Sequence, residues 1–523
     1  MDVCSLSAVE MLEKLDTKEV SSRELVDAHI ERIEKLDFRI NSIVHRFFSA
    51  ARQAADESDA RRAKSKSRKK RPLDGLPFTL KESLSTPNTP VSLGVPNWRH
   101  RLPHDEAVVG TLLEEAGGVC IGKTNVSQML LFHESDNPVF GRCNNPFALD
   151  RVPGGSSGGE AAAIAAGLSP GGVGTDIGGS IRVPAAFCGI AGIKPTVDRW
   201  SNIGSNSAIP GQEVIRSQCG PMARTTADVA LLLRAIDNPR HSVLDPLVNP
   251  MPIGDPGKVK AKKLRVGFYF DDGFINASPA VQRAVIEACD VLSDAGVHVV
   301  GIEAQCQREL LRVYLSALSA DGAWHLDHAM NGEGVMPQLR PLKAVVQLPQ
   351  ALRRAALRGL ELLGEDKAKL LVESVHEKTV AELWQLTNKR TQIRRQVMDY
   401  WRDMELDAVV CPAHATPALG HGHSNDFTLA GSYSIRYNFL NLPAGVVPVT
   451  RVLPNEEGRA ETRQRIDKKA ALVQQGSSGL PIGVQVVARP YREDVVLSLM
   501  QLIEDGVKGR ELYPTTPVEL SRN

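Results

Sequence analysis

PGGSSGGEAAAIAAGLSPGGVGTDIGGSIRVPAAFCGIAGIKP, residues 153–195, is the most distinctive segment of this chain of 523 residues. It includes twelve glycines and four serines, while glycine makes up about 7% of an average protein. Glycine allows backbone conformations in which successive N–H groups converge, and converging donors beside a hydroxyl form an oxyanion hole beside a nucleophile. Residues 174–180, GTDIGGS, fit this description. We therefore interpret the segment as a catalytic site and not as a packing element.

A serine nucleophile in this segment needs a base, because a hydroxyl is a poor nucleophile at its own pKa. Residues 153–195 contain no histidine. Upstream, residues 73–83, LDGLPFTLKES, contain an apolar, strand-like run that ends on Lys81. A lysine held against apolar neighbours loses its proton more easily, so Lys81 is the candidate base.

Three other interpretations of the glycine-rich segment are disfavoured. Residues 154–158 satisfy G-x-S-x-G, but the nucleophile elbow of α/β-hydrolases follows a buried strand, and residues 144–153, NNPFALDRVP, do not read as one. A phosphate-binding loop is disfavoured because Ile177 stands where the third glycine of G-x-G-x-x-G belongs. A purely structural turn does not account for three glycine-serine clusters followed by Arg182.

The segment resembles the signature of the amidase signature family of serine hydrolases. The resemblance extends over roughly residues 6–503 and includes the block that ends on Lys81. It implies a Ser-cisSer-Lys triad, with Ser180 as nucleophile, Ser156 as the bridging serine and Lys81 as base. It also implies a cis peptide between Gly155 and Ser156.

The same resemblance assigns further residues around the triad. The implied oxyanion donors are the backbone N–H groups of Ile177, Gly178, Gly179 and Ser180. The implied supporting polar residues are Ser157, Asp176 and Arg182. Met129, Leu130 and Phe132 are candidates for contact with an apolar acyl group, and a place in the hydrophobic core is the alternative for them. The resemblance implies neither a metal nor an organic cofactor.

Residues 133–146, HESDNPVFGRCNNP, are most similar to the fatty-acid amide hydrolase branch of the family. The implied function is hydrolysis of a small-molecule carboxylic amide, or of an ester or carbamate, with an apolar or fatty acyl group. Two alternatives stay open. One is the amidase subunit of a glutamine amidotransferase, which needs partner subunits, and the other is a non-catalytic scaffold of the same fold. The presence of Lys81, Ser156 and Ser180 argues against the scaffold.

Composition describes an ordinary globular protein, with 42% hydrophobic residues and a net charge of +1. This balance gives no reason to expect a nucleic-acid partner. The eight cysteines are scattered without C-x-x-C spacing, which favours reduced thiols in the cytoplasm. We find no signal peptide and no run of about 18 apolar residues. The oligomeric state is left open, with a homodimer as one candidate.

Three further features can each be interpreted as purely structural or as functional. The basic run at residues 61–71 is expected to be a solvated loop, with a nuclear-localisation or polyanion-binding patch as the alternative. Residues 348–363 form a basic amphipathic pattern, which predicts a helix packed by one face on the core; peripheral membrane contact or covering of a substrate channel is the alternative. His414, His421 and His423 lack an acidic partner at metal-ligand spacing, so no metal site is expected.

The expected fold is a single α/β domain over residues 1–523, with a central mixed, mostly parallel β-sheet flanked by helices on both faces. We expect N-terminal helices at residues 5–59, with Ser5 or Ser7 capping the first and Ser21 opening the second. A signature core at about 73–300 follows. A helical insertion at about 305–404 and a C-terminal sheet and helix at 406–505 complete the domain.

Overall fold

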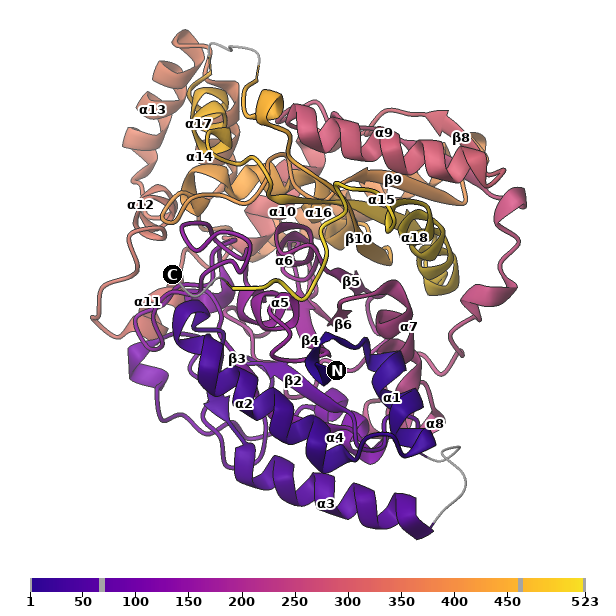
Figure 1. Cartoon of the computed structure of the whole chain (residues 1–523). Helices are drawn as coiled ribbons and strands as arrows, with labels where there is room; N and C mark the ends of the chain where they lie inside the picture. The colour runs from indigo at the N-terminus through magenta and orange to yellow at the C-terminus, as the bar shows by residue number, and fades with distance from the viewer. Residues whose placement is uncertain (1, 65–70, 460–463, 521–523) are drawn as a thin grey trace.

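A central sheet runs through the computed structural model, which describes residues 2–64, 71–459 and 464–520 (Figure 1). In these ranges eleven strands pair in the order β1-β3-β2-β4-β6-β5-β10-β11-β9-β7-β8. The strands are β1 (Ile43–Arg46), β2 (Pro77–Lys81), β3 (Val119–Thr124), β4 (Gly171–Asp176), β5 (Ala191–Lys194), β6 (Gln218–Ala223), β7 (Arg265–Phe268), β8 (His298–Gly301), β9 (Ala408–Pro412), β10 (Ala444–Arg451) and β11 (Pro481–Ala488).

The sheet is mixed, as expected, but the expectation that it is mostly parallel is wrong. Among the described strands, four neighbouring pairs are parallel, β3-β2, β2-β4, β9-β7 and β7-β8. The other six are antiparallel, including the whole central run from β4 to β9. The parallel pair β7-β8, at residues 265–301, lies at one end of the sheet.

Helices cover both faces of the sheet. Gly483 on β11 lies against Ala186 of α6 (Arg182–Phe187), while Gly445 on β10 lies against Val496 and Met500 of α18 (Glu493–Val507). The helix α5 (Gly158–Ala165) contacts α6, whereas α18 contacts α7 (Thr226–Ala235) and α9 (Pro279–Asp294). The signature helices α5 and α6 therefore occupy one face and α7, α9 and α18 the other.

Helices begin the chain, as the sequence predicts. Ser7 caps α1 (Ala8–Thr17) and Ser21 caps α2 (Ser22–Ile40), each in a capping box with a glutamate three residues later. The short strand β1 was not expected. It separates α2 from α3 (Phe48–Lys64), which includes the first four residues of the basic run, so the loop expectation is wrong there. Residues 65–70 lie outside the described residues.

Arg61 and Arg62 explain why the start of the basic run is not a free loop. Arg61 Nη2 donates to Asp74 Oδ1 at 2.9 Å, and Arg62 Nη1 donates to Asp16 Oδ1 at 2.9 Å. The first contact ties the end of α3 to the chain just before β2, and the second ties it to α1. The segment therefore helps to hold the strand that carries Lys81.

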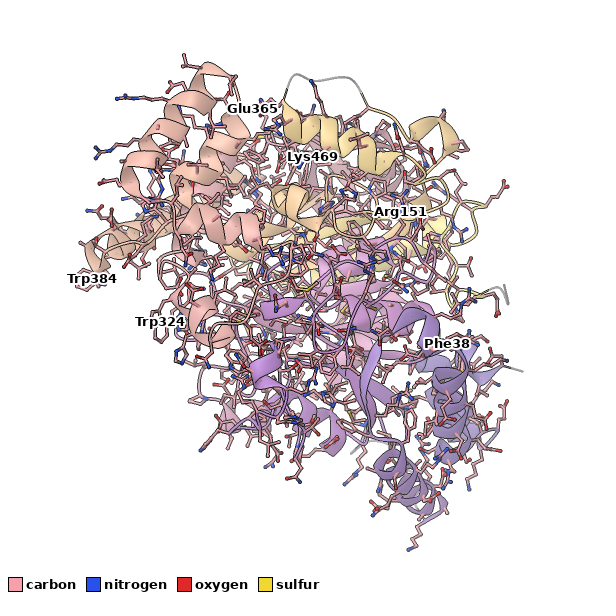
Figure 2. The ribbon with its side chains drawn as sticks, turned by 90° about the vertical axis from the view of Figure 1, so that its left-hand side faces the viewer. Phe38, Arg151, Trp324, Glu365, Trp384 and Lys469 are labelled. Carbon is pink, nitrogen blue, oxygen red and sulfur yellow. The ribbon has the colours of Figure 1, made fainter. Side chains whose placement is uncertain are left out.

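Residues 305–404 are helical, as expected. The helices are α10 (Gln307–Leu318), α11 (Trp324–Met330), α12 (Arg340–Val346), α13 (Gln350–Leu362), α14 (Asp366–Ser374) and α15 (Val380–Asp403). Side chains of α13 at positions 353, 356, 357 and 360 are half-buried, and none of its residues is fully buried. One face of α13 thus packs on the protein, as expected, but it is only partly buried. Figure 2 shows Trp324 and Trp384 of this insertion on the outside of the molecule.

The remaining helices connect strands or cover the sheet edges. They are α4 (Val108–Glu115), α8 (Pro239–Leu244), α16 (Ser432–Phe439) and α17 (Arg465–Gln474). Of the helices in the described ranges, none combines the length and the apolar character needed to cross a membrane.

Candidate active site

The amine of Lys81 lies in the centre of the candidate site. Lys81 is the last residue of β2 and is fully buried. Its Nζ lies 2.7 Å from Ser156 Oγ, 2.8 Å from Thr175 Oγ1 and 3.4 Å from Thr175 O. A neutral amine has two N–H donors and one lone pair, so it can donate twice to Thr175 and accept the hydroxyl proton of Ser156.

The surroundings of Lys81 favour this neutral form. Burial lowers the pKa of Lys81 from 10.5 to about 7, and the nearby carboxylates, Asp176 foremost, only partly oppose it. An amine with a pKa close to neutral is poised to act as a general base. The sequence correctly located a buried lysine at the end of this strand.

Ser156 and Ser157 occupy the turn between β3 and β4 that leads into α5. The Gly155–Ser156 peptide is cis, as the resemblance implied. Ser157 precedes α5 and joins this turn to β4, because Thr175 N–H donates to Ser157 Oγ at 3.4 Å. The N–H of Ser157 donates to Ser180 O at 3.1 Å. Ser157 therefore links the two glycine-serine segments, and its supporting role in catalysis stays a prediction.

Gly155 is needed where the turn passes the segment around residue 133. A Cβ at Gly155 would lie 2.6 Å from Phe132 O and 2.7 Å from Glu134 N. Both are backbone atoms, so neither can move aside as the end of a side chain can. The close approach places residues 132–134 directly against the Ser156 turn.

Ser180 lies in the loop between β4 and α6, and 5% of its surface is exposed. Its backbone carbonyl is bound by Ser157, which fixes its place next to Ser156. In the described ranges the hydroxyls of Ser156 and Ser180 share no hydrogen bond. The structure thus brings Lys81, Ser156 and Ser180 into one place, with a direct contact between the first two.

The four expected oxyanion donors are backbone N–H groups of the same loop. One of them already donates a hydrogen bond within the protein. The N–H of Gly179 donates to Asp176 Oδ1 at 2.7 Å, which does not match the expectation that it binds an oxyanion. The N–H groups of Ile177, Gly178 and Ser180 have no acceptor among the residues described here. Three backbone donors of this loop therefore remain available to bind a substrate oxygen.

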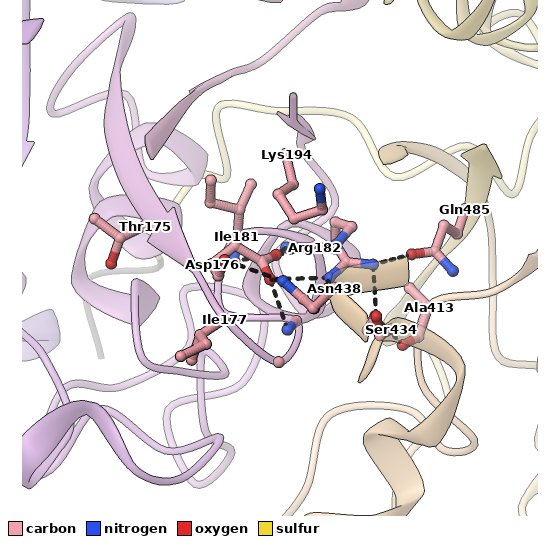
Figure 3. A network of polar contacts seen from close by, with 12 residues as sticks. Thr175, Asp176, Ile177, Ile181, Arg182, Lys194, Ala413, Ser434, Asn438 and Gln485 are labelled. Atoms are coloured by element: carbon pink, nitrogen blue, oxygen red, sulfur yellow. Dashed lines mark hydrogen bonds and ion pairs between the residues drawn. The ribbon is translucent and has the colours of Figure 1, made fainter. Parts of the chain in front are cut away.

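Asp176 and Arg182 form a buried ion pair under this loop (Figure 3). Arg182 Nε donates to Asp176 Oδ2 and Nη2 donates to Oδ1, each at 2.9 Å. The N–H of Ile181 also donates to Asp176 Oδ2, at 3.0 Å. Burial alone would raise the pKa of Asp176, but the Arg182 guanidinium holds it well below its usual range. Both residues thus hold this loop in place, and their role in catalysis stays a prediction.

Several residues of this network were not predicted from the sequence. Arg182 Nη1 donates to Ser434 O at 2.9 Å and to the side-chain oxygen of Gln485, and Asn438 Nδ2 donates to Asp176 Oδ1 at 2.9 Å. Gln485 is the only polar residue of β11. A lone amide in an apolar strand needs a buried partner, and that signal could have identified it.

The three acyl-pocket candidates lie near the site but do not share one environment. Met129 and Phe132 are buried in a small apolar cluster that also contains Leu326 and Met330 of α11, while Leu130 is half-buried. The cluster joins the site to the helical insertion. Contact with a substrate stays a prediction for all three residues.

Of the three histidines weighed as metal ligands, His414 is buried and His421 half-buried. The ring of His414 packs edge-on against Phe187 and lies 5.9 Å from the ring of His133. His421 Nδ1 lies 3.6 Å from Glu134 Oε1. These contacts give the two residues roles in packing around the site.

The chain is similar to known amidases in sequence and in fold. A model of the Amidase family matches residues 24–497. Fatty-acid amide hydrolase 1 of Sus scrofa is 36% identical over 438 residues, 83% of this chain and 75% of that protein. Fatty acid amide hydrolase 1 of Caenorhabditis elegans is 32% identical over 515 residues, 97% of this chain and 89% of that protein. A solved fatty acid amide hydrolase structure has a TM-score of 0.86 at 26% identity, covering 98% of this chain and 86% of that one.

Proposed function

The chain belongs to the amidase signature family of amide hydrolases, and we propose that it cleaves its substrate through an acyl-enzyme on Ser180. One observation carries the proposal. The buried Lys81 amine, whose pKa is lowered to about 7, lies 2.7 Å from the Ser156 hydroxyl. The contact pairs a base with a serine, next to a second serine and free N–H donors.

In the proposed acylation step, neutral Lys81 takes the proton of Ser156, and Ser156 takes the proton of Ser180. The Ser180 oxygen forms a bond to the amide carbon, and the carbonyl π electrons move to its oxygen. The N–H groups of Ile177, Gly178 and Ser180 bind this oxyanion. Because the two serine hydroxyls share no hydrogen bond in the described ranges, the relay requires them to approach each other when substrate binds.

Collapse of the tetrahedral intermediate breaks the C–N bond. The proton returns along the relay to the leaving nitrogen, so the amine departs neutral. Water then enters, loses a proton along the same path, and attacks the ester carbonyl of the acyl-enzyme. Ser180 recovers its proton as the carboxylic acid leaves.

We propose amides with an apolar or fatty acyl group as the substrate class. Support comes from the relatives described as fatty-acid amide hydrolases and from the apolar cluster of Met129 and Phe132, which adjoins the Ser156 turn. An ester or carbamate of the same acyl group presents the same carbonyl carbon to Ser180. Such substrates belong to the proposed range.

The test is intact-protein mass after treatment with a fluorophosphonate, on wild type, Ser180→Ala and Ser478→Ala. Ser478 is exposed and distant in sequence, so it serves as the matched control. We expect one adduct on wild type and on Ser478→Ala and none on Ser180→Ala. Absence of an adduct on folded wild type would indicate a non-catalytic scaffold.

A substrate panel then tests the acyl class. Short, long-chain and aryl amides and glutamine are offered at equal concentrations to untreated wild-type enzyme from a preparation that forms the adduct. We expect the highest kcat/KM for long apolar acyl groups. Turnover of glutamine alone would instead identify an amidotransferase subunit, and equal turnover of all amides would refute the apolar preference.

A further inference from the structure

Two side chains from outside the glycine-rich segment hold the carbonyls of the oxyanion loop. Tyr314 Oη donates to Ile177 O at 3.2 Å, and His133 Nε2 lies 3.2 Å from Gly178 O. Tyr314 comes from α10, the first helix of the insertion, and His133 precedes the Ser156 turn. Neither contact was predicted from the sequence.

The chemical state of both side chains makes them donors. Burial raises the pKa of Tyr314, so the phenol keeps its proton. Burial lowers the pKa of His133 to about 4, so the imidazole is neutral at working pH. A neutral imidazole carries one hydrogen, and the nitrogen that faces a carbonyl must be the one that carries it. His133 Nε2–H therefore donates to Gly178 O.

Each contact sets the direction of a backbone N–H. In a planar trans peptide the C=O and N–H bonds point in opposite directions. Tyr314, by holding Ile177 O, directs the N–H of Gly178 away from the phenol. His133 holds Gly178 O, while the N–H of the same peptide donates to Asp176 Oδ1. The Gly178–Gly179 peptide is thus held from both sides.

We propose that Tyr314 and His133 are positioning residues of the oxyanion loop: Tyr314 orients the Gly178 N–H toward the oxyanion, and His133 holds the next peptide, whose N–H is bound by Asp176. The proposal rests on the proposed function. Glycine at positions 178 and 179 leaves the loop without side chains of its own to restrict it, and Gly179 has a φ of 110°. Donors stabilise an oxyanion best when they are held in place before the reaction. The two outside contacts supply that restraint.

The arrangement also connects the insertion to the chemistry. A Cβ at Gly178 would lie 2.4 Å from Tyr314 Oη, so the phenol sits directly on the loop. α10 also contacts α14, α15 and α16. A shift of α10 therefore moves a group that touches the oxyanion loop.

The first test compares Tyr314→Phe with Tyr269→Phe. Both variants remove a buried phenol hydroxyl, but that of Tyr269 bonds to the hydroxyl of Tyr437 at 2.9 Å and not to the loop. We expect Tyr314→Phe to lower kcat about tenfold and to change KM by less than about twofold. We expect Tyr269→Phe to keep the wild-type kcat.

The affinity of a transition-state analogue is a second measurement, and it should not change if Tyr314 has only a structural role. A trifluoromethyl ketone carrying the acyl group of the best substrate adds the Ser180 oxygen and forms a tetrahedral oxyanion. Its affinity for Tyr314→Phe should fall by the same factor as kcat/KM. If the analogue binds this variant as it binds wild type, Tyr314 does not position the donor.

His133 is tested with His133→Leu and His133→Gln. Leucine removes the donor, whereas the glutamine amide can donate to Gly178 O. We expect His133→Leu to lower kcat and analogue affinity together, and His133→Gln to restore part of both. Equal losses in the two variants, or a wild-type kcat in His133→Leu, would overturn the role of His133.

Labelling of wild type distinguishes a failure of the proposed function from a failure of the positioning role. Without a fluorophosphonate adduct on wild type, the proposed function fails and the positioning role fails with it. With an adduct and normal turnover in wild type, an unchanged kcat in Tyr314→Phe and in His133→Leu refutes only the positioning role.

Discussion

The glycine-rich segment and the helical insertion differ in solvent exposure. Every residue of 153–195 is buried except Ile177, which is half-buried. In the insertion, α13 has no fully buried residue, and large apolar side chains face water: Leu362 is 89% exposed and Trp384 72%. One region is the packed surroundings of the candidate active site and the other a partly covered periphery.

The difference shows where the chemistry is specified. In the buried segment every charged group has partners, as Asp176 and Arg182 illustrate, because an unpaired buried charge is strongly unfavourable. In the insertion, pairs such as Arg402 and Asp399 are exposed to water. We therefore expect substitutions to be more destabilising in the first region than in the second. Tyr314 of the insertion contacts the loop of the first region at Ile177.

The largest expected effect comes from removing the triad. Ser180→Ala and Lys81→Ala should each lower kcat by about 10³-fold or more, because the groups act as one unit. For the same reason the double variant should be no worse than either single one. The measurement is turnover of the best amide. Multiplied losses in the double variant would show that Lys81 and Ser180 act independently.

Breaking the buried ion pair should have the next largest effect. Arg182→Met leaves Asp176 charged and unpaired in the core and should lower the free energy of unfolding by about 3–5 kcal/mol. Urea unfolding measures it. The control is Arg402→Ala, which removes an exposed pair and should leave the unfolding midpoint unchanged. Equal midpoints for the two variants would contradict the contrast between the regions.

The pH dependence of kcat/KM tests the state of Lys81. The amine accepts a proton only when it is neutral, and burial has lowered its pKa to about 7. The rate should therefore level off above about pH 7 and fall about tenfold per unit below it. Lys194 is equally buried, with its pKa also lowered to about 7 by burial, so Lys194→Met should keep the inflection. A flat profile from pH 5.5 to 8 would exclude a lysine base with this pKa.

The smallest effect is expected on the exposed face of the insertion. Leu362→Ser and Leu363→Ser replace side chains that are 89% and 77% exposed. Each should change the free energy of unfolding by less than about 0.5 kcal/mol and leave turnover of a short, soluble amide unchanged. Thermal unfolding and steady-state kinetics are the measurements. A large loss of stability would mean that α13 packs more closely than its exposure indicates.

Local features were the most predictable part of this protein. Ser7 and Ser21 cap helices because a serine three residues before a glutamate satisfies the first free N–H groups of a helix. Lys81 was found because an apolar strand that ends on a lysine is a pattern of neighbouring residues. β1 was missed because it is four residues long and only its first residue is fully buried, which leaves little alternation to detect.

Contacts between distant segments were not predictable in the same way. Arg182 and Gln485 are 303 residues apart in sequence, and Arg182 and Asn438 are 256 apart. A periodic pattern shows which face of a strand is buried but not which strand lies beside it. The same lack of information led to the wrong expectation of a mostly parallel sheet.

The sequence by itself determined the family, the starts of the first two helices and the candidates Lys81, Ser156 and Ser180, because these depend on residues close together in the chain. Only the tertiary structure decided that Gly179 donates to Asp176 and that Tyr314 and His133 hold the oxyanion loop. The same is true of the fall in the pKa of Lys81, which comes from complete burial by several strands and helices. Hydrogen-bond direction and desolvation depend on the whole fold, and no local pattern of residues specifies them.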